Sequence, residues 1–525
     1  MLFRSPLKSF TREYSPEGRV SGIITPDGTS VQFTYDNMGN IATIRDQNGI
    51  EEKFTNDVKA HSMTYSDAHM KKSSFMYSEG KVFGINKPDG TVLEYVRDSL
   101  GNIIEERASD KLLSKRSYDK MGNVISAENE EGTFQYEYDP MGRIKRFSSS
   151  ALSMELNYKY DHAGRLIQVL EKDPAGKSRM IHHSYDGVGR RIETTDWDGR
   201  KYHMKYNKAG RLASVVYPGD TVNGFIYGNG LKPIGEKLVI GDGNGSTEKE
   251  YQHDEWGRIK SIKSGGSLNS VFYDKAGRLA EVKDEQDSGL LSYTYDNKGN
   301  RLKGMEGKMY EYDKADQLVS YNDKGIACEY DANGNLISVT QEDKKTLYRY
   351  DAKDRLIEAK LASGDKIRFG YDPFGNLFRY EKNGKPLFFF NDGLNIYAVL
   401  DSEKKVLRRY LHGQGLDRPL ARRGQEGIDY LIVNATGDVG ATVSGTGKNT
   451  KTFRYLPFGN LVDKNPMNDK ILPPFLYKGR PCFAELGMYN MRARWYLPSL
   501  GRFLTRDKLS YRLQSPQNLH AYLYS

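Results

Sequence analysis

The sequence has 525 residues, of which 37% are apolar and 12% aromatic, with 37 tyrosines and 53 glycines. No stretch approaches the roughly 20 continuous apolar residues that a transmembrane helix needs, and the aromatic content is too high for a disordered chain. Two cysteines, Cys328 and Cys482, are too few for a disulfide framework or a cysteine-rich metal site. We therefore expect a Tyr- and Gly-rich, mostly β protein with no metal and no cofactor.

The formal net charge of +9 arises from 78 basic and 69 acidic residues. Their signs alternate along the chain without long runs of one sign, which favours a solvated sheet surface over a nucleic-acid interface. Residues 1–8 read MLFRSPLK and lack the apolar stretch of a secretory signal. We expect no nucleic-acid partner, no membrane-spanning segment and, if the protein leaves the cell, a non-classical route.

Along the chain, one short string recurs with a period of about 21 residues, the signature of a repeat architecture. It reads Tyr-Asp-x-x-Gly followed by Asn or Arg, and degenerate copies keep part of it. Full or nearly full copies begin at Tyr35, Tyr118, Tyr138, Tyr160, Tyr185, Tyr273, Tyr295, Tyr330 and Tyr371, and degenerate ones at Tyr14, Tyr206, His253 and Tyr350.

The string predicts a chain reversal. An Asp at the first turn position accepts a hydrogen bond from the backbone two residues on, and a Gly at the last position adopts the left-handed conformation. The flanking residues 133–138 and 143–147 alternate in polarity as strands do. Because a single hairpin is marginal in water, we expect successive hairpins to pair into one coiling antiparallel sheet, with the repeat tyrosines in register as an aromatic ladder.

The C-terminal third carries four further motifs in a fixed order. They are Y-L-H-G-Q-G-L-D at 410–417, Y-L-P-F-G-N at 455–460, G-M-Y-N-M-R-A-R-W-Y at 487–496 and L-G-R-F-L at 500–504.

Repeats and motifs together resemble the YD-repeat or Rhs (rearrangement hotspot) proteins, which include C subunits of insecticidal toxin complexes, polymorphic toxins of bacterial competition and the teneurin shell. The resemblance implies an all-β fold, a spiralling antiparallel β-hairpin repeat sheet that forms a hollow shell or half-shell. It divides the chain into repeats over 1–409 and an Rhs-associated core over 410–525. Two departures are residues 432–438, which retain little of the family's H-x-D-x-L-G-S element, and Leu497-Pro498 in place of Asp-Pro.

In toxin members the core ends in an aspartyl autoprotease that releases the toxin. By that resemblance Asp507 is the candidate catalytic acid and Arg502 its supporting cation; the alternative is a structural Arg502–Asp507 pair. Lys508 replaces the family's Pro, and residues 508–525 contain neither Asp nor Glu. Since acid proteolysis needs two carboxyl groups that share a proton, we expect this chain to be inactive by itself, with activity confined to a longer parent protein.

Two other features suggest chemistry only weakly. His182-His183 precedes a repeat tyrosine, so we expect a half-exposed strand position rather than a metal site. The glycine-rich strings 228–230 and 241–245 precede no predicted helix, so we expect hairpin loops rather than a phosphate cradle.

The leading hypothesis is a shell that encapsulates and helps deliver a C-terminal toxin, made by a bacterium and secreted or delivered without a signal peptide. Its partner is then an enclosed toxin polypeptide or a partner shell chain. The first alternative is a cargo-free, teneurin-like adhesion module that binds a glycan or protein on a target cell, and the second is the autoprotease.

Overall fold

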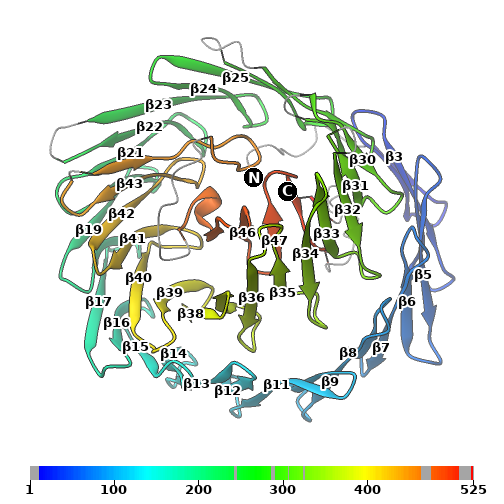
Figure 1. Ribbon diagram of the computed structural model, residues 1–525, viewed down its shortest axis with the longest axis horizontal. Helices are drawn as coiled ribbons and strands as arrows, with labels where there is room; N and C mark the ends of the chain where they lie inside the picture. The colour runs from blue at the N-terminus through cyan, green and yellow to red at the C-terminus, as the bar shows by residue number, and fades with distance from the viewer. Residues whose placement is uncertain are drawn as a thin grey trace. The chain divides into compact units, whose positions relative to one another are not determined.

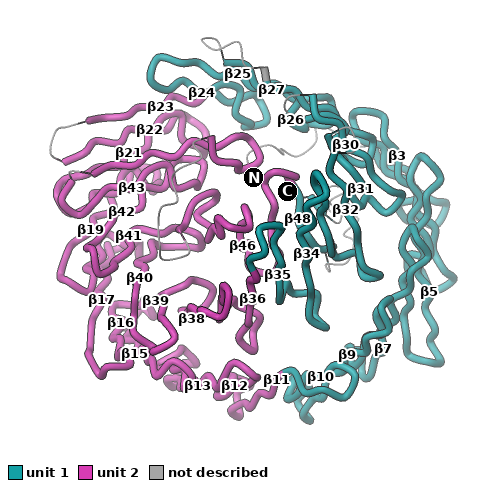
Figure 2. The backbone as a smooth tube through the Cα atoms, viewed as in Figure 1, with its two compact units in different colours: residues 1–113, 252–365, 502–525 teal, residues 114–251, 366–501 magenta. Residues whose placement is uncertain are grey.

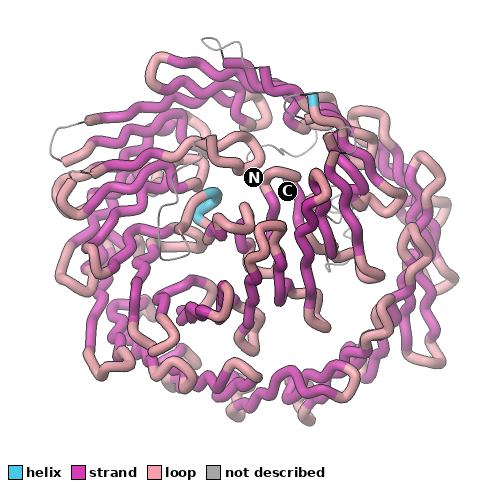
Figure 3. The backbone as a smooth tube through the Cα atoms, viewed as in Figure 1, coloured by secondary structure: helices cyan, strands magenta, loops and turns pink. Residues whose placement is uncertain are grey.

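The computed structural model describes residues 11–241, 245–284, 290–304, 307–322, 325–447, 449–462, 474–507 and 522–523. Its regular structure in these ranges is almost entirely strand (Figure 1; Figure 3). Two compact units are present, each assembled from segments that are distant in the sequence (Figure 2). Unit 1 comprises residues 1–113, 252–365 and 502–525, and unit 2 comprises residues 114–251 and 366–501.

In each unit we distinguish a first and a second strand run. The first run of unit 1 is β1 (Thr11–Tyr14), β2 (Val20–Ile24), β3 (Ser30–Tyr35), β4 (Ile41–Asp46), β5 (Glu51–Asp57), β6 (Ser62–Ser66), β7 (Lys72–Ser78), β8 (Lys81–Asn86), β9 (Val92–Arg97) and β10 (Ile103–Ala108). Its second run is β24 (Ile259–Ser264), β25 (Ser267–Tyr273), β26 (Leu279–Asp284), β27 (Leu290–Ser292), β28 (Thr294–Tyr295), β29 (Arg301–Lys303), β30 (Tyr310–Tyr312), β31 (Leu318–Tyr321), β32 (Ile326–Tyr330), β33 (Leu336–Gln341), β34 (Lys344–Tyr350) and β35 (Leu356–Lys360), and the unit also contains β48 (Arg502–Phe503).

Unit 2 has the same construction. Its first run is β11 (Lys111–Tyr118, in this unit from Ser114), β12 (Val124–Asn129), β13 (Gly132–Tyr138), β14 (Ile144–Ser149), β15 (Met154–Tyr160), β16 (Leu166–Lys172), β17 (Ser178–Tyr185), β18 (Arg191–Thr195), β19 (Lys201–Tyr206), β20 (Leu212–Val216), β21 (Val222–Tyr227), β22 (Pro233–Val239) and β23 (Ser246–His253). Its second run is β36 (Lys366–Tyr371), β37 (Leu377–Lys382), β38 (Lys385–Asp392), β39 (Asn395–Leu400), β40 (Val406–His412), β41 (Pro419–Gly424), β42 (Gly427–Val433), β43 (Val439–Ser444) and β44 (Thr450–Thr452), followed by the 3-10 turn η2 (Tyr477–Gly479), β45 (Cys482–Phe483), β46 (Met488–Asn490) and β47 (Trp495–Leu497).

Strands pair antiparallel with their neighbours in sequence. In unit 2, β13 pairs with β12 on one side and β14 on the other, and β15 continues the ladder. The register shifts by one residue at the repeat tyrosine, as at Glu137/Tyr138 and Lys159/Tyr160. This shift is the bulge expected of a hairpin whose loop ends in a left-handed glycine. The predicted antiparallel hairpin sheet is confirmed.

The repeat turn has the predicted chemistry. In the turn at 139–142, the backbone N–H groups of Met141 and Arg143 both donate to Oδ1 of Asp139, at 2.9 and 3.0 Å. Gly142 has φ of +76° and donates its N–H to the Asp139 carbonyl oxygen. We call these reversals YD turns, and we call the reversals at the other ends of the strands opposite turns.

The repeat tyrosines are linked through arginine rather than ring to ring. The Tyr160 hydroxyl donates to the carbonyl oxygen of Ile144 in the preceding hairpin, at 2.8 Å. The guanidinium of Arg143 lies over the Tyr160 ring, 4.5 Å from its centroid, and donates to Asp139 of its own turn at 2.7 Å. The same Arg-over-Tyr arrangement joins Arg165 to Tyr185, Arg190 to Tyr206, Arg211 to Tyr227, Arg258 to Tyr273 and Arg278 to Tyr295.

Within unit 2 the two strand runs pack on each other and bury a common core. Phe134 of the first run meets Phe378 of the second edge to face, with ring centroids 5.5 Å apart. Buried side chains from both runs form this core: Phe134, Phe147, Leu152, Met154, Leu156, Val169, Ile181, Tyr202, Met204, Val215, Tyr217, Leu238, Ile240, Phe378, Phe390, Tyr397, Ala398, Leu400, Leu411, Leu420, Ala421, Ile428, Tyr430, Ile432, Ala441 and Val443. The first run of unit 1 has a smaller core of Ile23, Phe33 and Ile44.

Two further sequence expectations can be checked. His182 is exposed, whereas His183 is buried and lies 3.0 Å from the Thr194 hydroxyl, so the expected half-exposed position holds for the first histidine only. Residues 228–230 form a hairpin loop as expected. The string 241–245 lies partly outside the described residues.

Candidate functional site

The C-terminal segment of unit 1 carries both residues that the sequence suggests for proteolysis. Strand β48 is held between other parts of the unit, because Leu336 donates its N–H to the Leu504 carbonyl oxygen and Phe503 donates to that of Tyr522. The Tyr522 side chain is 1% exposed, and its hydroxyl donates to the Gly334 carbonyl oxygen at 2.9 Å. Strand β48 and Tyr522 are therefore both held by hydrogen bonds to other parts of the unit.

Arg502 is a buried cation on the second-run turns of unit 1. It donates to Oδ1 of Asn300 at 3.0 Å and to the backbone carbonyl oxygen of Asp316. Its guanidinium lies 4.8 Å from the ring centroid of Tyr312 and 5.2 Å from that of Tyr522. Arg502 thus fixes the end of the chain to two YD turns and two aromatic rings.

Asp507 lies five residues after Arg502, and its side chain is half-buried. Its neighbour Arg506 reaches the first run of unit 1, where it pairs with Glu52 at 3.1 Å and with the buried Asp67 at 3.2 Å. Arg506 also lies over the Tyr65 ring and donates to its hydroxyl. The backbone that leads to Asp507 is therefore fixed at two residues before it, by Arg502 to the second run of the unit and by Arg506 to the first.

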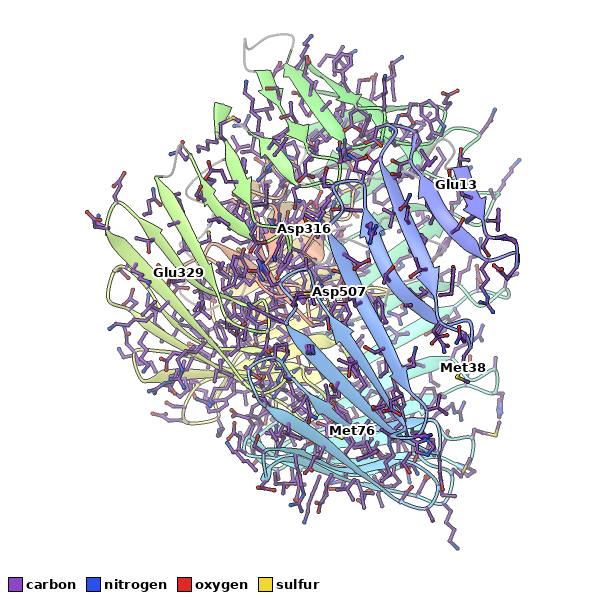
Figure 4. The ribbon with its side chains drawn as sticks, turned by 90° about the vertical axis from the view of Figure 1, so that its right-hand side faces the viewer. Glu13, Met38, Met76, Asp316, Glu329 and Asp507 are labelled. Atoms are coloured by element: carbon purple, nitrogen blue, oxygen red, sulfur yellow. The ribbon has the colours of Figure 1, made fainter. Side chains whose placement is uncertain are left out.

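A second acidic side chain, Asp316, lies beside the Arg502 anchor, and Figure 4 labels it together with Asp507. Its Oδ1 accepts a hydrogen bond from Asn300 at 2.9 Å and lies 3.5 Å from the Lys298 ammonium group. Burial raises the pKa of the Asp316 carboxyl above its usual range, although Lys298, Asn300 and Arg502 act in the opposite direction. Burial thus favours the protonated form of this carboxyl group, whereas the contact with Lys298 favours the ionised form.

Sequence reasoning missed Asp316, although a signal was present. The turn at 313–316 has Asp at the position where the repeat normally has Gly, and Asp316 there adopts a φ of +62°. Asp tolerates this left-handed conformation better than most residues with a side chain, and Asp354 adopts it at the same position of the turn at 351–354. The replacement therefore marks repeat turns that can carry an extra carboxylate.

The core motifs of unit 2 bind one another. Asp417, the last residue of the first motif, accepts hydrogen bonds from Arg480 at 2.6 Å and from both terminal nitrogens of Arg492 at 2.7 and 3.1 Å. Asn460 of the second motif donates to the Pro498 carbonyl oxygen at 2.8 Å, and Tyr496 donates to that of Phe458 at 2.9 Å. These contacts give the motifs a structural role in closing the end of the sheet.

Unit 2 also contains a small cavity of about 200 Å³, lined by Arg408, Arg422, Lys451, Phe453 and Phe475 among others. This volume lies below the roughly 300–1,000 Å³ of typical ligand pockets. Among the described residues no group of three or more His, Cys, Asp or Glu side chains is placed to hold a metal ion. No helix in the described part of the chain has the length and apolar character of a membrane span.

Two family models match the chain. Residues 109–230 and 226–525 match the family model described as Teneurin YD-shell, and residues 14–51 match the one described as RHS Repeat. The chain belongs to the teneurin YD-shell family. The expected fold class, an all-β antiparallel hairpin-repeat sheet of the YD/Rhs type, is confirmed.

Relatives of the chain include two bacterial proteins, one named as a tRNA nuclease and the other as a DNA deaminase toxin. It is 27% identical to tRNA nuclease WapA of Bacillus subtilis over 338 residues, which are 62% of this chain and 14% of that protein. It is 22% identical to the double-stranded DNA deaminase toxin A of Burkholderia cenocepacia over 614 aligned positions, covering 98% of this chain and 42% of the toxin. The chain thus spans less than half the length of either relative.

Among solved structures, the chain is similar to one described as TcdB2-TccC3-Cdc42. The match covers 98% of this chain and 35% of that chain, with 14% identity and a TM-score of 0.49.

Proposed function

We propose that the chain is a shell segment that encloses and helps deliver a toxin polypeptide. The observation that supports this most is the combination of YD-shell family membership with a sheet in which many successive repeats are joined by a tyrosine and an arginine, as Tyr160 and Arg143 join theirs. A sheet so regular is suited to containment. Because relatives of the chain are named as a nuclease and as a deaminase toxin, we propose that the enclosed polypeptide is toxic.

The proposal extends to organisation and location. Residues 1–409 form the repeat part and 410–525 the Rhs-associated core, in a bacterial protein that is secreted or delivered to another cell. The partner is an enclosed toxin polypeptide or a second shell chain; a glycan or protein on the target cell remains the partner of the cargo-free alternative.

Protease protection tests enclosure. The protein is purified from its producing cell, the polypeptides that it retains are identified by mass spectrometry, and the complex is treated with proteinase K before and after mild denaturation. We expect a retained polypeptide that is digested at least tenfold faster once the shell is opened. Equal digestion rates, or no retained polypeptide, would favour the cargo-free adhesion module.

A second candidate function, self-cleavage, is supported by the fixed backbone that leads to Asp507 and by the buried Asp316 carboxyl group beside Arg502. In acid proteolysis one carboxylate removes a proton from water, the water oxygen attacks the carbonyl carbon, the C–N bond breaks, and the other carboxyl group protonates the leaving amine. We assign Asp507 as the candidate base or acid and Arg502 as its positioning cation, active in a longer parent chain. Asp507→Asn in that parent should abolish release of the C-terminal polypeptide; unchanged release would remove Asp507 from the reaction.

A further inference from the structure

The turn at 434–437 in unit 2 inverts the chemistry of the repeat. Asn434 takes the place of the turn Asp, and its Oδ1 accepts hydrogen bonds from the N–H groups of Thr436 and Asp438 at 3.0 and 2.9 Å. Asp438 follows the turn glycine, at the position where the repeats normally carry Arg or Asn. A carboxyl group therefore stands where the repeat normally has a hydrogen-bond donor.

The partner of Asp438 is the side-chain nitrogen of Lys478 in η2. Lys478 Nζ lies 3.2 Å from Asp438 Oδ1 and donates to the Thr436 carbonyl oxygen at 3.1 Å. The Lys478 side chain is 11% exposed and the Asp438 side chain 7% exposed. The backbone fixes both residues, because Lys478 donates its N–H to Asp438 Oδ1 at 2.9 Å and Val439 donates to the Leu476 carbonyl oxygen at 3.0 Å. The nitrogen and the carboxyl group are therefore held in direct contact and largely out of solvent.

The hydrogen bonds of Thr436 favour a protonated Asp438. The Thr436 hydroxyl group contacts two oxygen atoms, Oδ1 of Asn434 at 2.7 Å and Oδ2 of Asp438. Both contacts are hydrogen bonds only when Asp438 carries a proton, because the hydroxyl group has one hydrogen and Oδ1 of Asn434 has none. Burial also lowers the pKa of the Lys478 ammonium group, although Asp438 acts in the opposite direction. Together these features favour a carboxylic acid beside a neutral amine.

Aromatic rings pack beside this pair. Lys478 Nζ lies 4.8 Å from the ring centroid of Tyr477, and the ring centroids of Tyr455 and Tyr489 lie 5.9 and 5.8 Å from that of Tyr477. Tyr477 and Tyr489 are buried. Such surroundings disfavour the charged forms of both groups and exclude the water that would compete for the carboxyl carbon.

We propose that Lys478 and Asp438 are joined by an isopeptide bond between their side chains. The lone pair of Lys478 Nζ attacks Asp438 Cγ, the N–C bond forms and the Cγ–Oδ2 bond breaks. Oδ2 leaves as water with the carboxyl hydrogen and one amine hydrogen, and the amide keeps the other amine hydrogen. Oδ1 becomes the amide oxygen, and the Lys478 N–H that it already accepts stabilises the negative charge that develops there during the attack.

The bond closes a covalent loop from residue 438 to residue 478 and ties η2 to the start of β43. A cross-link of this kind stabilises a fold by restricting the unfolded chain, as a disulfide does, and reducing agents do not break it. The bond concerns the stability of unit 2 and does not depend on the proposed function.

Mass spectrometry of the denatured 525-residue chain tests the bond without any substitution. We expect the purified chain to be lighter than its sequence by one water molecule. After digestion with trypsin, the water should be missing from a branched peptide in which Lys478 is joined to Asp438. A chain of full mass would overturn the proposal, and so would a water missing from another position, such as a succinimide at Asp198-Gly199.

Two lysine variants provide a matched comparison. Lys478→Arg keeps a cation beside Asp438 but removes the amine, so this variant should have its full mass. Lys382→Arg is the control, because Lys382 pairs with Glu485 at 3.4 Å in the same unit and both side chains are more exposed, at 34% and 28%; this variant should still lack one water. A water still missing from Lys478→Arg, or present in Lys382→Arg, would overturn the assignment. If Lys478→Arg does not fold, the peptide map of the unsubstituted chain remains decisive.

Discussion

The guanidinium of Arg165 lies over the ring of Tyr185, 5.0 Å from its centroid, while its Nε donates to Asp161 at 2.6 Å. One side chain thus joins the turn of its own repeat to the tyrosine of the next. The Tyr185 hydroxyl also joins the two repeats, because it donates to the carbonyl oxygen of Leu166, next to Arg165, at 2.7 Å.

Replacing this arginine should weaken the sheet although the charge is kept. A lysine ammonium group is not planar, so it cannot stack on the Tyr185 ring as the guanidinium does, and it cannot bind Asp161 through two nitrogens. Arg165→Lys should therefore lower the free energy of unfolding by about 1 kcal/mol. Urea denaturation measures the change. Arg146→Lys is the matched control, because Arg146 pairs with Glu137 and Glu155 on a solvent-exposed face and should change stability by about 0.5 kcal/mol or less. Equal losses in the two variants would contradict a special role for the stack.

A buried ion pair joins the two runs of unit 2. The Glu171 carboxylate is fully buried and accepts from Arg409 at 2.6 Å and from the Tyr397 hydroxyl at 2.9 Å. Arg409→Met leaves the buried carboxylate with the more distant Arg179, at 3.7 Å, and should destabilise the unit by about 3 kcal/mol.

The double variant Glu171→Leu with Arg409→Met is the informative control. Because it removes both charges, it should recover at least half of that loss in thermal denaturation. A double variant less stable than the single one would show that packing, not the unpaired charge, is responsible.

Acid should destabilise unit 2 through His183. Burial lowers the pKa of this imidazole to about 3, with further contributions from Arg191 and His182. Since the folded-state pKa lies below the ordinary value of about 6.5, the stability that neutral His183 contributes is complete above pH 6.5 and is lost as the pH falls toward 3.

The slope attributable to this group approaches about 1.4 kcal/mol per pH unit within that window. His183→Gln should flatten the pH dependence of the unfolding midpoint, whereas His182→Gln at the exposed neighbouring position should leave it nearly parallel to the original. If the two variants give the same pH profile, His183 is not the titrating group.

The Tyr522 anchor should contribute strongly to unit 1. Truncation in Tyr522→Ala removes a ring that is 1% exposed, its bond to Gly334 and its contact with Arg502, and should cost about 3 kcal/mol or more. Hydrogen exchange of β33 and β48 reports the loss locally. Tyr14→Ala, at a tyrosine that is 60% exposed, should leave exchange unchanged. Unaltered exchange in the Tyr522 variant would mean that the clamp does not hold the segment.

The sequence was sufficient for the fold because the repeat encodes local chemistry. Asp139 and Gly142 define their turn without help from distant residues, so strand direction and period could be predicted. The stacking of Arg143 on Tyr160 could have been inferred from the Arg that follows the turn glycine, but a ladder of tyrosines alone was expected.

The site was less predictable because its partners are distant. Arg502 meets Asn300 and Asp316, which lie 202 and 186 positions away, and no local pattern reports such contacts. The burial of His183 beside exposed His182 likewise depends on which face of β17 the second strand run covers.

In many repeats the tyrosine hydroxyl donates to a carbonyl oxygen of the hairpin that precedes it, as those of Tyr160, Tyr185 and Tyr206 do. We therefore expect the hairpins of such a sheet to fold in order from the N-terminus, because the carbonyl oxygen that accepts each tyrosine hydroxyl belongs to a hairpin that is synthesised earlier. Duplicating or deleting a whole repeat leaves every remaining hydroxyl with an equivalent carbonyl, so the length of these proteins can change in evolution without a new folding solution.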